Sequence, residues 1–307
     1  DVKSFVVVDE AHYIKRLNGR WSNAAMRLAE DSNFRCVLTG TPLPRSYSDF
    51  YNLFEFLWPD NSPISRQTKM LIESIDSNET NLAVHSAFER EIGPLHFRVR
   101  KSDLRLADQN FYQPILIEQN PIEKEIYNAI TNRINILSKE DEYLHEVSLI
   151  HKLKRGRVMR LRQAASYSNL LRTALYEDDT EFESLSFKDS KIGEMIRDYD
   201  QLETPNKINA LLKIVKDLNQ SGEKVIIWSS FVNTIKLISR RLHQEDIHNE
   251  RIYGEIPFLD HPYKEIKSRT KIKNIFLDPN SGLDVIIANP AAFAESVSLH
   301  TTCSHAI

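Results

Sequence analysis

Two adjacent carboxylates stand directly after a short apolar run near the start of the chain. Residues 5–8 read Phe-Val-Val-Val, and Asp9, Glu10, Ala11 and His12 follow them. Such a run is typical of a strand buried on both faces of a parallel sheet, and ligands bind at the carboxyl ends of these strands. We therefore expect a nucleotide site, in which Asp9 holds Mg²⁺ through water and Glu10 orients and deprotonates the attacking water. A solvated pair of acids is the alternative, because four letters also occur by chance.

A second apolar run ends in hydroxyls, glycine and proline. Residues 34–42 read Phe-Arg-Cys-Val-Leu-Thr-Gly-Thr-Pro. Between the two runs, the pattern over 23–30 is helical, with Ala24, Ala25 and Leu28 expected on one buried face. The order strand, helix, strand predicts a crossover that brings both strand ends to the same edge of one sheet.

Three segments in this order resemble the first motor lobe of the Swi/Snf-type superfamily-two helicase-like ATPases. They are Asp-Glu-Ala-His at 9–12, Leu-Thr-Gly-Thr-Pro at 38–42, and an aromatic segment ending in Trp-Pro at 49–59. The resemblance implies ATP and Mg²⁺ as cofactors, with Asp9 and Glu10 at the metal and the water. It also implies that His12 and a Thr-Gly-Thr segment link the nucleotide site to a DNA-binding cleft. The matching positions are Thr39, Gly40 and Thr41.

The middle of the chain, residues 120–203, has an almost wholly helical pattern that we expect to form an insertion. Half of the stretch 151–162 is basic. Such a run is usually a solvated face, but it can also follow a phosphate backbone, with Arg155 and Arg157 as candidate ligands. Leu-Arg-Gln at 161–163 resembles a helix of the same family.

The last third repeats the alternation of apolar strands and amphipathic helices. Strands are expected at 224–231, 251–254 and 284–289, and helices at 204–221, 232–242 and 263–277. Residues 111–118 are expected to form the return strand of the first lobe. We therefore predict the α/β class, with two RecA-like parallel-sheet lobes, both incomplete, and a helical insertion between them. The expected domains are 1–119 for the first lobe, 120–203 for the insertion and 204–307 for the second lobe.

Second-lobe motifs support the same resemblance and give further candidate nucleic-acid ligands. Ser229, Ser230 and Phe231 end one expected strand. The family usually has a glycine-rich segment where this chain has residues 292–299, which contain no glycine. Glycine allows the backbone amides to come close to DNA phosphates or the nucleotide. In its absence, the hydroxyl groups of Ser296 and Ser298 are the candidates to make these contacts. Similar variants occur in prokaryotic members of the family.

Composition sets limits on class and location. The chain has 307 residues, a net charge of −3 and two cysteines, so it is an ordinary globular sequence with room for two domains. No apolar run is long enough to span a membrane. Cys36 and Cys303 are read as small core residues in a reducing compartment, which favours the cytoplasm, at the nucleoid if prokaryotic. His300, Cys303 and His305 offer three metal ligands at most, so a zinc site is disfavoured.

Two motifs of such a motor are absent, and the start at Asp1 suggests a piece of a longer protein. The sequence contains no Gly-x-x-x-x-Gly-Lys-Ser/Thr phosphate loop and no final arginine-bearing motif. We expect the parent to be a DNA-dependent ATPase that translocates on duplex DNA, with possible protein partners, and this segment alone to be inactive. The alternatives are an RNA helicase, a restriction-system motor subunit, and a non-catalytic nucleic-acid-binding scaffold.

Overall fold

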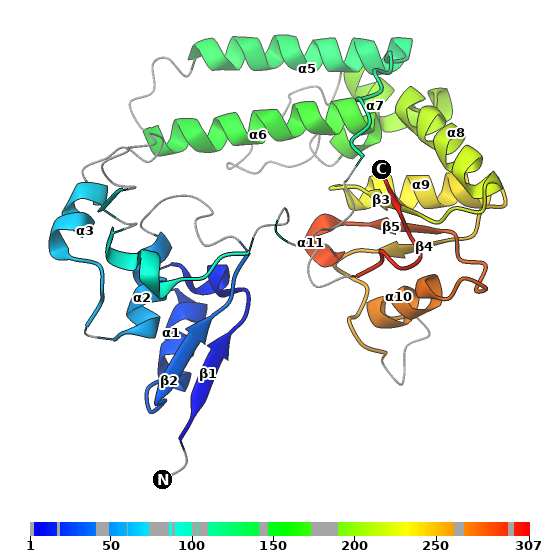
Figure 1. The fold of residues 1–307 in the computed structure, drawn as a ribbon. Coiled ribbons are helices and arrows are strands. Elements are labelled where there is room, and N and C mark those ends of the chain that lie inside the picture. Colours follow the sequence, from blue (N-terminus) through cyan, green and yellow to red (C-terminus); the bar gives the residue numbers. More distant parts are fainter. Residues whose placement is uncertain are drawn as a thin grey trace. The chain divides into compact units, whose positions relative to one another are not determined.

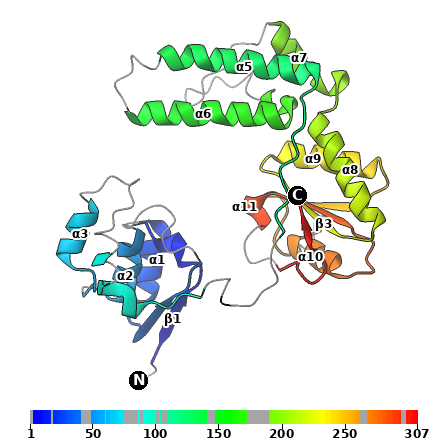
Figure 2. The same ribbon diagram turned by 45° about the horizontal axis from the view of Figure 1, so that its top comes forward.

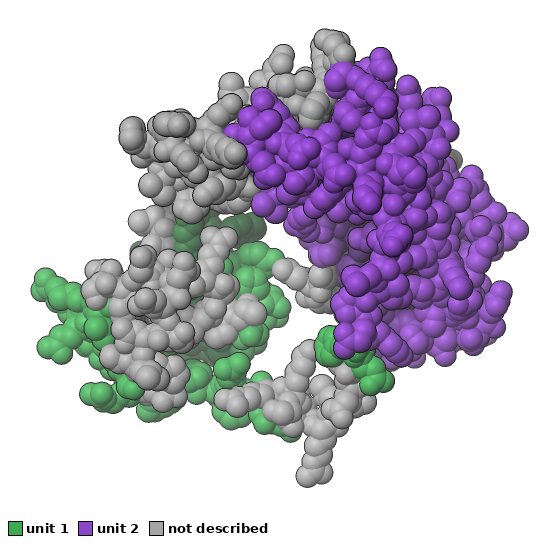
Figure 3. All heavy atoms as spheres, turned by 90° about the horizontal axis from the view of Figure 1, so that it is seen from above, with its two compact units in different colours: residues 1–111 green, residues 112–307 purple. Residues whose placement is uncertain are grey.

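The chain folds into two compact units, residues 1–111 and 112–307, in a computed structural model (Figure 3). The structure describes residues 3–16, 19–40, 49–59, 61–73, 86–87, 90–99, 103, 110–140, 147–172, 190–260, 267–293 and 298–307. Side chains at 49–50, 72–73, 137–140 and 147–155 lie outside this description.

Unit 1 contains a pair of parallel strands with helices packed on one face (Figure 1). Its elements are β1 (Phe5–Val8), η1 (Ala11–Ile14), α1 (Arg20–Leu28), β2 (Phe34–Val37), α2 (Asp49–Leu57), α3 (Arg66–Glu73) and η2 (Gly93–Leu95). Val7 is in register with Cys36, and Val8 with Val37. The expected strand, helix, strand crossover over the first 40 residues is therefore confirmed, but β1 is not buried on both faces as we expected, because Phe5 is 63% and Val7 47% exposed.

The helix between these strands turns a different face inward from the one that we expected. Leu28 is 81% exposed and Ala24 is exposed, whereas Ser22 and Ala29 are buried and Ala25 packs against the core. Ala25 is thus the only residue of the expected face that packs inward. The small inward side chains allow η1 and α2 to approach closely, which apolar periodicity alone does not encode.

Unit 2 begins with a helical block. It consists of α5 (Pro121–Glu140), α6 (Val147–Ser166), η5 (Ser168–Leu171) and α7 (Lys191–Leu202). Helix α5 begins at Pro121, and the Glu123 carboxylate accepts a hydrogen bond from the backbone N–H of Asn120 at 3.0 Å. This is a capping interaction that fixes the start of the helix. The side-chain amide of Asn120 donates to the backbone oxygen of Thr204 at 2.7 Å, and this bond joins the two ends of the block.

The second part of unit 2 is a four-stranded parallel sheet with helices around it (Figures 1 and 2). Its elements are α8 (Asn206–Gln220), β3 (Val225–Trp228), α9 (Val232–His243), β4 (Asn249–Ile252), α10 (Arg269–Leu277), β5 (Val285–Ala288), α11 (Pro290–Phe293) and β6 (His305–Ala306). The strand order is β4-β5-β3-β6. Strand β5 is fully buried, as the apolar run predicts for a parallel sheet covered on both faces. Helix α10 is shorter than the expected 263–277, of which 263–266 lie outside the described residues.

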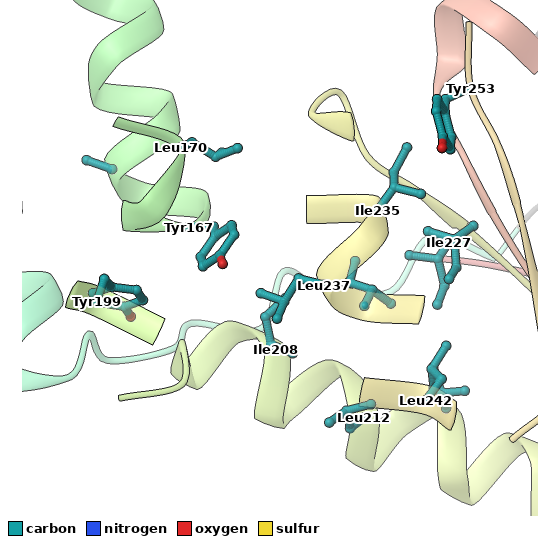
Figure 4. Packing of buried hydrophobic residues seen from close by; sticks show 14 of the residues in the cluster. Tyr167, Leu170, Tyr199, Ile208, Leu212, Ile227, Ile235, Leu237, Leu242 and Tyr253 are labelled. Carbon is teal, nitrogen blue, oxygen red and sulfur yellow. The ribbon is translucent and has the colours of Figure 1, made fainter. Parts of the chain in front are cut away.

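One hydrophobic cluster joins the helical block to this sheet (Figure 4). Tyr167 and Tyr199 from the block belong to the same cluster as Ile208, Leu212 and Ile227 of the sheet region. The expected division at 203/204 therefore crosses a continuous core, and by contacts the chain divides near Phe111 instead. Burial and the carboxylate of Asp200, which accepts a hydrogen bond from the Tyr167 hydroxyl, raise the pKa of Tyr167.

The expected return strand at 111–118 is not a strand. Residues 110–120 have no regular secondary structure, and Leu116 is 94% exposed. The Asn206 amide donates to the backbone oxygen of Glu118 at 3.0 Å, which ties this segment to the start of α8 in unit 2. A segment with high β-propensity becomes a strand only where a sheet edge is available to pair with it. Residues 112–118 belong to unit 2 and do not pair with the strands of unit 1.

No helix in the described part of the chain is long and apolar enough to cross a membrane. Cys36 and Cys303 are free thiols, and both are only partly buried. Burial raises the pKa of the Cys303 thiol.

Candidate functional site: the carboxyl ends of the strands

The ends of β1 and β2 are joined by backbone hydrogen bonds that continue beyond the strands. The N–H of Leu38 donates to the oxygen of Val8, and the N–H of Ala11 donates to the oxygen of Leu38, each at 2.9 Å. These bonds hold the Asp-Glu-Ala-His segment against the Leu-Thr-Gly segment. The structure thus brings the two motifs to one edge of the sheet, as the crossover predicts.

Glu10 has a backbone conformation that is rare for its residue type. Its φ and ψ are 48° and 45°, in the left-handed region, and the chain turns there from β1 into η1. The side chain of Asp9 accepts a hydrogen bond from the Glu10 N–H at 2.8 Å, and the oxygen of Glu10 accepts one from the N–H of Tyr13 at 3.0 Å. A left-handed non-glycine residue costs about 1–2 kcal/mol, so these bonds stabilise the turn that displays the carboxylate at the strand end.

His12 lies between the two motifs. Its Nδ1 atom is 3.2 Å from Oε2 of Glu10 and 3.5 Å from the hydroxyl oxygen of Thr39. The ring of Tyr13 packs beside it, with ring centroids 4.4 Å apart. The side chain of His12 is 21% exposed and that of Glu10 is 44% exposed, so the pair is open to a ligand at the edge of the sheet. Gly40 is exposed, and Thr41 lies outside the described residues.

The donor set at this edge fits a magnesium ion held jointly with a nucleotide. The described residues contain no cluster of three or more histidine, cysteine, aspartate or glutamate side chains able to hold a metal ion. One oxygen of Asp9 is engaged by the Glu10 N–H, which leaves the other for a water of the metal. Mg²⁺ is usually bound by one or two carboxylates, several waters and substrate phosphates, so a single exposed aspartate meets this requirement.

A cavity of about 770 Å³ lies within unit 2, at the carboxyl end of β3. It is lined by the expected nucleic-acid segment Ser229, Ser230 and Phe231. Two cations that sequence analysis did not select, Arg162 and Lys207, also line it, and both are exposed. The apolar part of its wall comes from the segment 115–117 and from α8, and the acids Glu118 and Glu123 also line it.

The polar groups of this cavity are held by local bonds. The Ser229 hydroxyl oxygen accepts from the N–H of Phe231 at 3.4 Å, and the Asn289 amide donates to the oxygen of Ser230 at 3.0 Å. The hydroxyl of Thr234, a residue 4% exposed, lines the same cavity and finds no hydrogen-bond partner among the described atoms. Helical periodicity places Thr234 and Lys207 in helices, but only packing shows that they meet the β3 end.

The basic run of α6 does not form the uniform exposed surface that we expected. Arg157 is 7% exposed and Arg160 is 9% exposed, whereas Arg162 is exposed. Because a buried guanidinium cannot reach a phosphate without repacking, Arg157 is a wrong choice for a solvent-facing ligand. Arg155 lies in α6, but its side chain is outside the described residues.

The hydroxyl candidates after β5 are placed only in part. Ser298 is exposed, and its hydroxyl oxygen is 2.8 Å from Nδ1 of His300. Ser296 lies outside the described residues. His300, Cys303 and His305 do not form a metal-binding cluster in the described structure.

Comparison with known proteins identifies the family. Residues 3–170, more than half of the chain, match the model of the SNF2-related domain. The chain belongs to the SNF2-related domain family. Human chromodomain-helicase-DNA-binding protein 8 is 24% identical over 256 residues, and rat chromodomain-helicase-DNA-binding protein 6 is 26% identical over 258 residues. In both cases the match covers 82% of this chain but 9% of the relative, so the chain spans about a tenth of the length of these proteins.

Solved structures of SNF2-type and helicase proteins are also similar. The Sulfolobus solfataricus SWI2/SNF2 ATPase core, solved in complex with double-stranded DNA, is 18% identical, with a TM-score of 0.36, over 94% of this chain and 54% of that one. The Pyrococcus furiosus Hef helicase domain is 14% identical, with a TM-score of 0.39, over 94% and 61%. The SNF2-type resemblance and the α/β class with parallel sheets, both expected from the motifs, are confirmed.

Proposed function

We propose that this chain is the part of a DNA-dependent ATPase motor that senses the nucleotide and grips duplex DNA. The contact of His12 with both Glu10 and Thr39 carries the proposal. It gives a direct physical link between a carboxylate suited to act on water and the hydroxyl segment after β2. Membership of the SNF2-related domain family supports a motor that couples ATP hydrolysis to translocation on DNA.

At the nucleotide, the chain's own groups act by position. Asp9 would hold waters of a Mg²⁺ ion, and this ion would neutralise phosphate charge when bound with ATP. Glu10 accepts the proton of the attacking water and aligns it. His12 contacts that carboxylate through its Nδ1 atom, so a movement of the carboxylate shifts the imidazole. The shifted imidazole then displaces Thr39, and with it Gly40 and Thr41.

At the nucleic acid, the cavity edge of unit 2 offers hydroxyls and cations together. Ser229, Ser230 and Phe231 line the same cavity as Arg162 and Lys207. Hydroxyls, backbone N–H groups and cations are the usual ligands of phosphate oxygens, and they fix position without reading sequence. Sequence-independent contact of this kind is what translocation along duplex DNA requires. Ser298 and the undescribed Arg155 and Ser296 remain further candidates, and protein partners and a cytoplasmic or nucleoid location belong to the same proposal.

The decisive experiment measures phosphate release in a polypeptide that contains this chain together with a phosphate-binding loop. We expect stimulation by duplex DNA and its loss in Glu10→Gln. Stimulation by RNA alone would contradict the DNA motor in favour of an RNA helicase. The absence of turnover under every condition would favour a nucleic-acid-binding scaffold.

The 307-residue chain by itself provides the matched control. It contains no phosphate-loop motif, and the lysine and backbone N–H groups of that loop hold the β- and γ-phosphates in this class of enzyme. We therefore expect no measurable hydrolysis by the chain alone, with or without duplex DNA. Turnover that Glu10→Gln abolishes would overturn this part of the proposal.

A further inference from the structure

A second group of positively charged side chains lies on α9 and the neighbouring strand β4, away from the cavity at the end of β3. Its members line a hollow of about 420 Å³ and are Lys236, Ser239, Arg240, His243, Gln244 and Arg251. We call these residues the α9 cluster. Among the residues that the structure describes, none of those lining the hollow is acidic. Lys236, Arg240, His243 and Arg251 are all exposed, in a chain whose net charge is −3.

The charges of the cluster are not cancelled by ion pairs in the described structure. The carboxylate nearest in sequence, Glu250, pairs with Lys267. Successive residues of a strand point to opposite faces, so Glu250 faces away from the side on which Arg251 lies. Glu245 at the end of α9 pairs with Lys216 of α8. The positive potential of the cluster is therefore available to a ligand.

Packing holds several members in place. Lys236, Arg240 and His243 are spaced four and three residues apart, so they share one face of the helix. The ammonium of Lys236 lies 5.6 Å from the centre of the Tyr253 ring. The amide of the buried Asn249 lies 2.6 Å from Nδ1 of His243. These two contacts restrict the positions of the Lys236 and His243 side chains.

The cluster and the cavity lie on opposite flanks of one helix. Thr234 and Ile238 face the cavity, and at 100° per residue Lys236, Arg240 and His243 lie on the other side. A ligand at the cluster therefore does not compete with one at Ser229, Ser230 and Phe231 for the same surface.

We propose that the α9 cluster binds the phosphate backbone of duplex DNA as a second contact, separate from the cavity edge. This inference rests on the proposed function. From Lys236 to His243 the helix rises about 10 Å, so the row is long enough to contact more than one phosphate of a strand, since these follow each other every 3.4 Å along the duplex axis. A single bound anion would need a closed site of converging donors, whereas this row is exposed and extended.

The first test compares the binding of a short labelled duplex to the chain at several salt concentrations. The variant carries Lys236→Gln and Arg240→Gln, and the matched control carries Lys213→Gln and Lys271→Gln, two exposed lysines outside both surfaces. Each lost phosphate contact lowers the slope of log affinity against log salt by about 0.9, so the variant should lose about 2 and the control less than 1. Equal slopes for the variant and control would overturn the inference.

The second test needs no substitution. We expect duplex DNA to protect Lys236 from acetylation, read by mass spectrometry, while Lys213 stays reactive. Protection by a phosphorylated peptide, with none by duplex DNA, would instead assign the cluster to a protein partner and overturn the inference. If the wild-type chain binds no duplex at all, the proposed function fails with it. If it binds duplex while Lys236 stays reactive, only the second contact fails.

Discussion

At the scale of single residues, His12 is the point where two motifs meet. Its Nδ1 atom is in reach of both Glu10 and Thr39, at 3.2 and 3.5 Å. One Nδ1 atom cannot form a well-aligned hydrogen bond with the Glu10 carboxylate and the Thr39 hydroxyl at once. A movement of the carboxylate therefore alters the contact with the hydroxyl. This is a local two-partner arrangement of the kind that coupling between sites requires.

The variant His12→Ala is placed in the polypeptide that contains this chain and a phosphate-binding loop. We expect it to reduce the stimulation of ATP hydrolysis by DNA more than it reduces the basal rate of hydrolysis. The substitution leaves Asp9 and Glu10 in place but removes their link to Thr39. Steady-state phosphate release with and without duplex measures both quantities. Equal loss of the two rates would show that His12 serves only the nucleotide.

A double-mutant cycle tests whether His12 and Thr39 act together. For His12→Ala and Thr39→Val we expect a coupling energy of about 0.5–3 kcal/mol in the activation by DNA, because the side chains are within contact distance. Additive effects would contradict the coupling. Thr131→Val is a suitable control, because its hydroxyl donates to the oxygen of Tyr127 within α5, away from His12 and Thr39 in the sequence.

At the scale of elements, a tertiary carboxylate fixes the start of α3. Glu91 accepts hydrogen bonds from the N–H of Ser65 at 2.9 Å, from its hydroxyl at 2.6 Å and from the Thr68 hydroxyl at 2.8 Å. Burial raises the pKa of Glu91, but these bonds outweigh it, and the net pKa is lowered. A carboxyl with a lowered folded-state pKa stabilises the fold above its unfolded pKa and loses this effect as the pH falls through the folded value.

We therefore expect Glu91→Gln to destabilise unit 1 at neutral pH and to reduce the loss of stability on acidification below the usual carboxyl range. Denaturant unfolding at a series of pH values measures both effects. A variant that is as sensitive to acid as the wild type would show that Glu91 does not carry this dependence.

The second element-scale prediction concerns Lys224, at the start of β3. Its ammonium is buried and donates to the backbone oxygens of Phe276 and Asp278, each at 2.8 Å, at the end of α10. Burial lowers the pKa of Lys224, and the carboxylates of Asp284 and Asp278 oppose the shift. We expect Lys224→Met to cost about 2 kcal/mol of unfolding free energy, because charge-assisted bonds to helix-terminal oxygens are lost. Lys213→Met, on an exposed site, should be near neutral.

At the scale of the molecule, the helical block and the second sheet form one unit. Tyr167 and Tyr199 share a core with Ile208 and Leu212. We expect residues 112–307 to unfold in a single cooperative transition, and residues 204–307 alone to be destabilised, since removing the block exposes Ile208 and Leu212. Calorimetry of the two fragments measures this. Equal stability of the shorter fragment would restore the division at 203/204.

From the sequence alone we located β1, β2, β3 and β5, most helices and the two motif segments of unit 1, but also a strand at 111–118 that does not form. Continuous apolar runs followed by acids or hydroxyls encode parallel strands and their carboxyl ends, because both are properties of neighbouring residues. For this reason Asp9 and Glu10 could be selected from the residues, and the resemblance of the motifs to a known family added Thr39 and Ser229.

Packing between distant segments selected which faces and partners these elements have. Arg157 is buried, Leu28 is exposed, residues 111–118 form no strand, and Lys207 and Ser229 line the same cavity. These outcomes depend on what packs against an element and which sheet edge is available, so they follow from contacts between residues far apart in the chain. Local periodicity shows that a face exists, and packing selects which face is covered.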